Sequence, residues 1–257
     1  MNEINALILG VVEGFSEFLP ISSTGHLILT AELLKISHTD FLKSFELAIQ
    51  LGAILSVIAL YCRSLLTDFA TLKKVAIAFA PTAGIGLIFY RFMKQHLLGS
   101  TTVVLWSLLL GGIFLVIFEL LYRKRGAQRI HSSSMSCRQA LLIGVFQSLA
   151  MIPGVSRSAA TIIGGLILGL ERRKIVEFSF LLAIPTMAAA VGFDLVQNAA
   201  GFSSTQVNIL AIGFLTSFIV ALAAVKLFLS FVARYSFISF GVYRIVLALL
   251  FWMYLSR

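Results

Sequence analysis

Six apolar stretches divide this chain, and each is close to the roughly 20 residues that an α-helix needs to cross a bilayer. They lie near residues 44–61, 75–92, 102–122, 176–193, 207–230 and 237–256. Only 12% of the 257 residues are charged, whereas about 25% are charged in an ordinary soluble domain. Because so few charges cannot coat a water-soluble globule, the sequence predicts an all-α, polytopic membrane protein with six transmembrane helices.

Two further apolar segments, residues 4–34 and 138–170, are each interrupted near the middle by a turn-forming polar cluster. The clusters are Pro20-Ile21-Ser22-Ser23-Thr24-Gly25 and Pro153-Gly154-Val155-Ser156-Arg157-Ser158. Backbone that leaves a helix cannot face lipid, so each break must lie inside protein or against a watery cavity. We therefore predict two re-entrant helix-loop-helix pairs, each of which enters and leaves the membrane on the same side.

The two halves of the chain resemble each other. The segment Ser44-Phe45-Glu46-Leu47-Ala48-Ile49-Gln50 returns as Ser179-Phe180-Leu181-Leu182-Ala183-Ile184-Pro185 with five identical residues. The pairs Gly10-Val11 and Gly144-Val145 also precede the two breaks at matching spacing. We predict a single domain over residues 1–257, built from two repeats at about 1–125 and 138–257. Since each repeat would cross the membrane three times, the second would point the opposite way, as an inverted-topology repeat.

Basic residues between the apolar segments fix the expected orientation. Twelve Lys and Arg residues fall on one side of the membrane, including the run from Arg123 to Arg138, and five fall on the other. The richer side is predicted to be cytoplasmic. The basic loop that joins the repeats is then cytoplasmic, and the first broken loop opens outward. Topology thus accounts for the net charge of +9, and no basic face of a nucleic-acid-binding protein is indicated.

Glu13 and Glu17 lie four residues apart and so share one face of the first short helix. Ionised carboxylates in an apolar helix are unfavourable unless they face a cavity, a cation or an arginine. Their oxygens suit a hard divalent cation such as Mg²⁺ or Ca²⁺, which would also contact phosphates. We predict a metal site at these two residues; a structural ion pair, or protonation of one carboxyl, is the alternative.

Ser22, Ser23, Thr24 and His26 occupy the first break and the start of the helix after it. Hydroxyl and free N–H groups at a helix start bind anions. A hydroxyl within reach of an imidazole also matches the nucleophile and base of covalent catalysis. We predict a catalytic anion site here, although a serine N-cap and a helix-end histidine would also explain the pattern.

Arg157 lies at the second break, between Ser156 and Ser158 and one turn before Thr161. A guanidinium at membrane depth needs an anionic partner, and its planar fork matches the oxygens of a phosphate. We predict that Arg157 clamps a phosphorylated substrate with the neighbouring hydroxyls around it. A buried ion pair with a glutamate of the first broken segment is the alternative, and the two interpretations are compatible in the filled and the empty site.

Other polar residues of the apolar segments receive lesser roles. Glu46 is expected to face inward, and Glu177 and Asp194 to lie near the membrane interfaces. Lys226 can extend its amine to an interface. Arg244, in the last span, has no obvious partner, so its replacement by alanine is expected to leave most activity intact.

The two carboxylates, the hydroxyl beside an imidazole and the arginine framed by serines form the inventory of phosphoryl transfer, in which catalysis is mainly positioning and charge neutralisation. The sequence has no Gly-rich Walker loop, which argues against a nucleotide-driven machine. A polyanionic substrate with an apolar body, presented from within the bilayer, fits both the polar residues and the apolar surface. A lipid diphosphate is such a substrate.

The broken segments resemble the two signature motifs of the bacterial undecaprenyl-diphosphate phosphatase family, also called the bacitracin-resistance protein family. The matching residues are Glu13-x-x-x-Glu17 with Leu19 to His26, and Pro153 to Thr161, where Ala159 replaces an expected glycine. The resemblance implies a hydrolase of the bacterial plasma (inner) membrane that converts undecaprenyl diphosphate to undecaprenyl phosphate and inorganic phosphate at the periplasmic face. Such an enzyme recycles the lipid carrier for peptidoglycan synthesis, cell wall biogenesis and cell shape, and confers bacitracin resistance.

The resemblance also implies the roles of individual residues. The catalytic residues would be Glu17, Ser23, His26 and Arg157, the metal ligands Glu13 and Glu17, and the substrate-binding residues Ser22, Thr24, Ser156, Ser158 and Thr161. The nucleophile stays open between Ser23, His26 and water, and the sequence leaves a homodimer open. A polyprenyl-phosphate transporter or flippase is the alternative function, because inverted repeats with broken helices are typical of secondary transporters.

Overall fold

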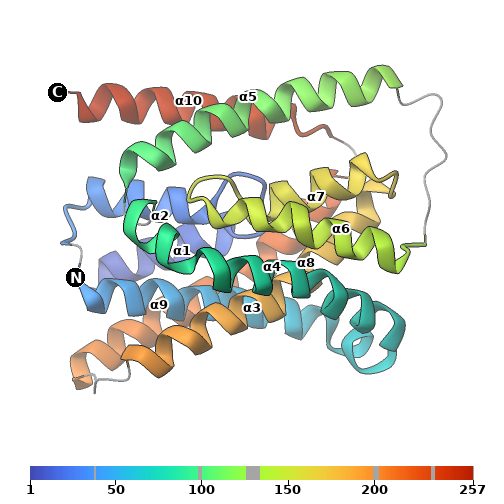
Figure 1. The fold of residues 1–257 in the computed structure, drawn as a ribbon. Helices are drawn as coiled ribbons and strands as arrows, with labels where there is room; N and C mark the ends of the chain where they lie inside the picture. Colours follow the sequence, from blue (N-terminus) through green and yellow to red (C-terminus); the bar gives the residue numbers. More distant parts are fainter. Residues whose placement is uncertain (38, 98–99, 126–133, 199–202, 233–234, 257) are drawn as a thin grey trace.

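The computed structural model describes residues 1–37, 39–97, 100–125, 134–198, 203–232 and 235–256; of residues 90–91, 93–96, 125 and 193–198 only the backbone is described. Within these ranges the chain forms ten α-helices, one short 3₁₀ helix and no β-strand (Figure 1). The elements are α1 Glu3–Ser16, α2 Ser23–Leu33, α3 Asp40–Thr67, α4 Phe69–His96, α5 Thr101–Arg125, α6 Cys137–Ser148, η2 Leu149–Met151, α7 Arg157–Ile167, α8 Arg172–Asn198, α9 Ser204–Val232 and α10 Ile238–Leu255.

Six of these helices, α3, α4, α5, α8, α9 and α10, are long and apolar enough to cross a membrane. The six predicted spans are thereby confirmed, and several extend beyond the apolar core that marked them in the sequence. Helix α3, for example, starts four residues before its predicted span, because the side chain of Thr39 accepts a hydrogen bond from the backbone N–H of Leu42 and caps the helix. The protein is a multi-pass, all-helical membrane protein.

The two remaining segments are broken helices, as the sequence predicts. Helices α1 and α2 are separated by residues 17–22, and α6 and α7 by η2 and residues 152–156. Ser136 begins α6 with a capping box, in which its hydroxyl and the Gln139 side chain each bond the other's backbone N–H. That each pair enters and leaves the membrane on one side stays a prediction.

Two short helices followed by three long ones occur in residues 3–125 and again in residues 137–255. The two halves interlock: α1 packs against α9 and α6 against α4, while α3 contacts both α8 and α9. Helices α5 and α10 lie side by side along one edge of the molecule (Figure 1). Helices α1 and α6 pack mainly on long helices of the opposite half, whereas α2 and α7 contact mainly helices of their own half, so the two breaks lie where the halves meet. The duplication and its inverted orientation stay predictions.

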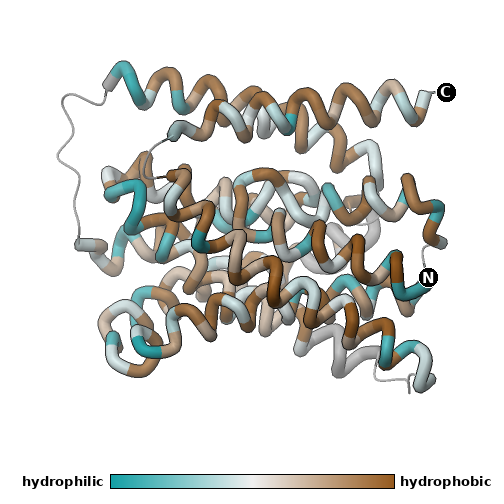
Figure 2. The backbone as a smooth tube through the Cα atoms, turned by 180° about the vertical axis from the view of Figure 1, so that it is seen from behind, coloured by the Kyte–Doolittle hydropathy of each residue, from teal (hydrophilic) through white to brown (hydrophobic). Residues whose placement is uncertain are grey.

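The outer surface of the long helices is apolar. Figure 2 shows hydrophobic residues along the middle of these helices and hydrophilic residues gathered towards their ends. Leu87 and Ile88 of α4, for example, are each 76% exposed. Such a surface suits contact with lipid chains.

Both termini lie at one end of the molecule, and the end of α5 and the start of α6 lie at the other (Figure 1). The predicted basic loop between the repeats includes residues 126–133, which are outside the described residues. Its cytoplasmic position stays a prediction.

Candidate active site

The two breaks bring the first residues of α2 and α7 to one carboxylate. Glu17 ends α1 and is 8% exposed. Its Oε2 accepts a hydrogen bond from the Ser23 hydroxyl at 2.5 Å, and its Oε1 accepts one from Nη2 of Arg157 at 3.1 Å. A glutamate and a serine of the first half are thus hydrogen bonded with an arginine of the second half in one buried network of polar side chains. The structure therefore contains the ion pair that was the alternative interpretation of Arg157.

Ser22 and Ser156 cap the two helices in the same unusual way. Ser22 has a φ of 71° and Ser156 a φ of 81°, in a region that costs a non-glycine residue about 1–3 kcal/mol. Each hydroxyl accepts a hydrogen bond at 3.3 Å from a backbone N–H three residues later, that of Gly25 or Ala159. The first N–H groups of α2 and α7 have no helical partner, so both helix starts favour an anion beside Glu17.

The guanidinium of Arg157 is held from α8. Its Nη1 donates to the carbonyl of Ser179 at 2.7 Å, and the hydroxyls of Ser179 and Thr161 are 2.7 Å apart. The Ser158 hydroxyl donates to the carbonyl of Leu19 at 2.7 Å and so ties the second break to the first. The bond to Ser179 holds Nη1 of the arginine, so that Nη2 is directed at the Glu17 carboxylate.

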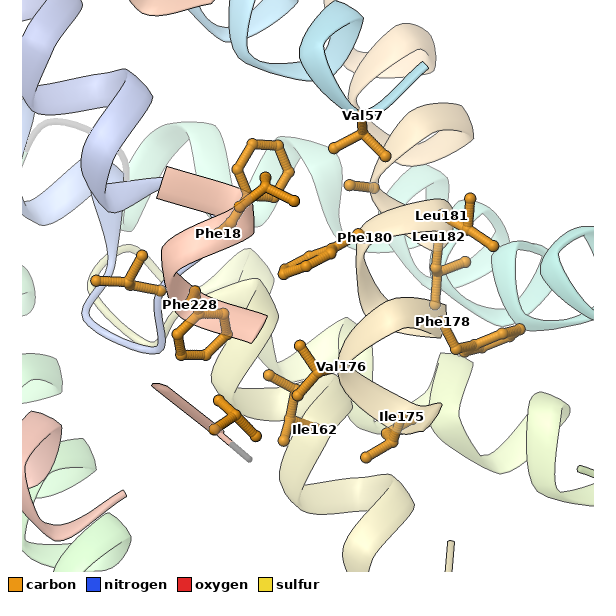
Figure 3. Packing of buried hydrophobic residues seen from close by; sticks show 14 of the residues in the cluster. Phe18, Val57, Ile162, Ile175, Val176, Phe178, Phe180, Leu181, Leu182 and Phe228 are labelled. Atoms are coloured by element: carbon orange, nitrogen blue, oxygen red, sulfur yellow. The ribbon is translucent and has the colours of Figure 1, made fainter. Parts of the chain in front are cut away.

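A cluster of aromatic side chains packs beside this network of polar side chains. The rings of Phe18 and Phe180 meet edge to face, with centroids 5.3 Å apart, and Phe228 of α9 lies beside Phe180 (Figure 3). Phe18 is next in sequence to Glu17, and Phe180 is next to Ser179. Close packing of these rings therefore restricts the backbone that carries the polar partners.

A pocket of about 180 Å³ opens beside Glu17 and Arg157. Its lining includes residues of both breaks and of α3, α4, α6 and α8, namely Glu17, Ser22, Ser23, Thr24, Gln50, Thr82, Gln147, Pro153, Gly154, Ser156, Arg157 and Thr186. Of the predicted substrate-binding residues, Ser22, Thr24 and Ser156 line this pocket. Ser158 and Thr161 are fully buried and are not among the lining residues, so they lie in position to support the site from behind.

Glu13 lies behind Glu17. It is fully buried, and among the described residues neither of its carboxylate oxygens has a hydrogen-bond partner. Glu17 and Glu46 are its nearest acidic neighbours. Two adjacent carboxylates, one of them unpartnered, suit a hard divalent cation. The described part of the chain holds no group of three or more His, Cys, Asp or Glu side chains placed for a metal, so substrate and water would complete the ligand shell.

His26 and Ser23 are hydrogen bonded to other groups and not to each other in this structure. The histidine Nδ1 lies 2.7 Å from the carbonyl oxygen of Ser22, and its Nε2 lies 2.7 Å from the hydroxyl of Tyr243. The histidine lines a second, mostly apolar groove of about 480 Å³ between α1 and α10. The hydroxyl of Ser23 bonds instead to Glu17, so the hydroxyl and imidazole predicted to pair are both present but bonded to other groups.

Sequence reasoning missed four polar side chains that contribute to the site, namely Ser179, Gln147, Thr82 and Thr186. Ser179 was noted only as part of a repeat, yet it orients Arg157. On the pocket wall, Gln147 donates from its amide to the hydroxyls of Thr82 at 2.8 Å and Thr186 at 3.1 Å. The internal repeat is the sequence signal that could have identified Gln147, because Gln147 occupies the position in the second half that Glu13 occupies in the first.

The expectation that Arg244 lacks a partner was wrong, so the prediction that Arg244→Ala leaves most activity intact loses its basis. Arg244 is 1% exposed and donates from its two terminal nitrogens to four backbone carbonyl groups. Backbone acceptors have no sequence signature, which is why none was found. Glu177 pairs with Arg173 at a partly exposed position, and its place near a membrane interface stays a prediction. The side chain of Asp194 lies outside the described residues.

The family model described as "Bacitracin resistance protein BacA" matches residues 6–250 of the chain. The chain belongs to this family. The match includes both broken segments, so it confirms the family resemblance that their motifs indicate.

Relatives of the family match over nearly their whole length. A protein of Aquifex aeolicus is 53% identical over 251 residues, which cover 98% of each chain. A protein of Wolinella succinogenes is 48% identical, covering 100% of this chain and 99% of its own, and one of Sulfurihydrogenibium sp. is 47% identical, covering 99% and 100%. All three are named undecaprenyl-diphosphatase.

Proposed function

We propose that the chain is an undecaprenyl-diphosphate phosphatase, which hydrolyses undecaprenyl diphosphate to undecaprenyl phosphate and inorganic phosphate. The observation that carries the proposal is the convergence of Ser23 and Arg157, at the starts of two helices from opposite halves, on Glu17 beside a polar pocket. Full-length relatives of that name support the same assignment. The product would return to peptidoglycan synthesis, and excess enzyme would confer bacitracin resistance.

The diphosphate would lie between the starts of α2 and α7, with its polyprenyl chain in the bilayer. Arg157 now pairs with Glu17, and on binding it would turn its Nη2 to a phosphate oxygen while Ser179 holds its Nη1. The hydroxyls of Ser22, Thr24 and Ser156 line the same pocket and would bind the remaining oxygens. These donors neutralise the charge that develops on the phosphate during transfer.

Ser23 is the nucleophile in this mechanism and Glu17 is its base, because the two are already hydrogen bonded. The Ser23 oxygen attacks the terminal phosphorus, Glu17 takes the hydroxyl proton, and the bond to the bridging oxygen breaks. Glu17 passes that proton to the departing undecaprenyl phosphate. In the second step Glu17 takes a proton from water, whose oxygen attacks the phosphoserine, and returns it to Ser23 as inorganic phosphate leaves.

His26 contributes through the backbone in this scheme. It holds the carbonyl of Ser22, the residue before the nucleophile, and is itself held by Tyr243. In this mechanism His26 is therefore a positioning residue that keeps the first loop in place, and Glu17 takes the proton from Ser23.

Glu13 and Glu17 would hold a divalent cation, Mg²⁺ or Ca²⁺. The two unpartnered oxygens of Glu13 beside a second carboxylate support this assignment. When bound, the cation would neutralise phosphate charge. It would also relieve the repulsion between the two carboxylates.

We place the protein in the bacterial inner membrane with the pocket open to the periplasm. Gln50 lies in the first half of α3 and Thr186 in the second half of α8, which puts the pocket nearer the end of the molecule that carries both termini. The distribution of basic residues along the sequence supports an outward position for that end. The partner is the membrane lipid substrate; no nucleic acid is expected, and a homodimer stays an open prediction.

The test is phosphate release by the purified protein in detergent, supplied with undecaprenyl diphosphate and Mg²⁺. We expect stoichiometric inorganic phosphate and undecaprenyl phosphate. A transporter or flippase would release no phosphate in detergent yet move the labelled lipid across proteoliposomes. That combination of results would refute the phosphatase assignment.

A further inference from the structure

Arg244 of α10 contacts both breaks at once. Its Nη2 donates to the carbonyl of Gly154 at 2.8 Å, and its Nη1 donates to the carbonyls of Val155 at 3.0 Å and Pro20 at 3.4 Å. A fourth bond joins Nη2 to the carbonyl of Ser107 on α5 at 2.9 Å. One side chain therefore ties the first loop, the second loop and the α5–α10 pair together.

The carbonyls that it holds occupy equivalent places in the two loops. Pro20 lies two residues before Ser22, and Gly154 lies two residues before Ser156. These two serines are the N-caps with positive φ, a conformation that persists only where the surroundings impose it. Arg244 therefore bonds the backbone one or two residues before each strained serine, and Ser23 and Arg157 follow those serines directly.

Backbone carbonyls are the hydrogen-bond acceptors that the structure gives the Arg244 guanidinium. In the part of the chain that the structure describes, no carboxylate forms an ion pair with it, and it is 1% exposed. A buried charge satisfied only by backbone oxygens is costly unless the geometry is good. The two terminal nitrogens of Arg244 donate four hydrogen bonds from one rigid plane, although Nε has no partner among the described residues, and a lysine lacks this planar arrangement.

Helix α5 leaves room for this group at Gly111. A Cβ atom added at Gly111 would collide with the guanidinium of Arg244. The far end of an arginine usually moves aside easily, but this one is held by four carbonyls. An added methyl group at Gly111 would therefore push against the bonds that hold the loops.

We propose that Arg244 is a positioning residue for the reaction: it clasps the two loops so that the nucleophile of the first faces the arginine of the second. This inference rests on the proposed phosphatase activity and assigns Arg244 no contact with substrate. Misplacement of reacting groups by about 1 Å costs about 100-fold in rate. We call the hydrogen bonds between Arg244 and the two loops the clasp. Loss of the clasp should lower kcat far more than it changes KM.

The first test compares Arg244→Met, Arg244→Lys and a matched control, Arg172→Met. Arg172 is also a poorly exposed arginine, but it pairs with Glu119 at 2.8 Å and stacks on Phe237, away from the loops. Phosphate release from undecaprenyl diphosphate gives kcat and KM, and thermal unfolding in detergent gives Tm. We expect kcat to fall about 100-fold in Arg244→Met with KM changed less than about threefold.

The lysine variant should recover part of that kcat, since an ammonium group still donates to some carbonyls. Arg172→Met should lower Tm while keeping kcat per folded molecule. If Arg244→Met keeps kcat within about threefold of wild type, or loses activity only in proportion to its loss of folded protein, as Arg172→Met does, the clasp is refuted. Wild-type protein that releases no phosphate would instead refute the proposed function.

A second test applies even if Arg244→Met does not fold. Gly111→Ala inserts one methyl group against the clasp, whereas Gly84→Ala on α4 meets no atom within 4 Å. We expect Gly111→Ala to lower kcat about tenfold and Gly84→Ala to leave it within about twofold. In the Arg244→Lys background the added methyl should do little further harm, because the flat guanidinium is gone. Additive effects of the two changes, or a harmless Gly111→Ala, would contradict the proposal.

Discussion

The first and second loops share a backbone shape but not a chemistry. Each follows a short helix, bends at a serine with positive φ and starts a second short helix with that serine as its cap. After the cap, however, the first loop places Ser23 and the second places Arg157. In the proposed mechanism, two loops of the same shape therefore have different roles: the first would supply the nucleophile and its base, and the second would supply the arginine. Neither loop alone contains the parts for phosphoryl transfer.

The largest expected effect comes from the second loop. Arg157→Ala should reduce phosphate release to background and weaken the binding of undecaprenyl diphosphate. The buried Glu17 carboxylate and the diphosphate would both lose the guanidinium that neutralises them. Arg157→Lys should retain a small part of the activity, since an ammonium lacks the planar fork. Arg173→Ala, which removes a partly exposed ion pair of α8, is the control and should stay near wild type. Near-normal turnover of Arg157→Ala would remove this residue from the site.

Ser23→Ala tests the chemistry of the first loop. We expect kcat to fall by about 1,000-fold or more, with residual substrate binding through Arg157. The control is Ser56→Ala, at a buried serine of α3 whose hydroxyl donates to the Ala53 carbonyl of its own helix. Rapid quenching of wild-type enzyme with substrate labelled on the terminal phosphate should leave label on Ser23. Label on His26 would instead make the histidine the nucleophile.

Glu13→Gln makes the first half resemble the second, where Gln147 holds the equivalent place. The variant should need about tenfold more Mg²⁺ for half-maximal phosphate release, because one proposed ligand loses its charge. Without metal it should unfold at a higher temperature than wild type, since a buried carboxylate with no hydrogen-bond partner disfavours the fold. An unchanged Mg²⁺ requirement would separate Glu13 from the metal site.

The smallest effect is expected at the caps. Ser156→Ala should lower the free energy of unfolding by about 1 kcal/mol through loss of the N-cap. Ser156→Gly should lose less, because glycine adopts a φ of 81° without strain. Thermal unfolding of the two variants measures the difference. Equal losses would mean that the left-handed conformation at the cap carries no strain.

Much of the fold follows from local sequence patterns. Apolar runs of membrane-spanning length predict the six long helices, and the Pro, Gly and Ser clusters at residues 20–25 and 153–158 predict the two breaks. The interlocking of the halves, with α1 on α9 and α6 on α4, depends on contacts between residues far apart in the sequence. No local pattern encodes those contacts.

The part of the site that could be predicted consists of charged side chains, because charges are rare in membrane-embedded segments. Glu17 and Arg157 stood out as charges at the breaks, and the structure joins them directly. The partners of Arg244 are backbone carbonyls, which every residue carries, so no sequence pattern connects that arginine to the loops. The same limit applies to the Ser179 carbonyl, which orients Arg157.

The most direct test of one active site built from two loops is a structure of the protein with a non-hydrolysable methylene analogue of a polyprenyl diphosphate. The account predicts that the diphosphonate lies between the starts of α2 and α7, in contact with Arg157 and with the Ser23 hydroxyl near its terminal phosphorus. A diphosphonate bound elsewhere, for example in the groove beside His26 and Tyr243 with the Arg157–Glu17 pair intact, would contradict it.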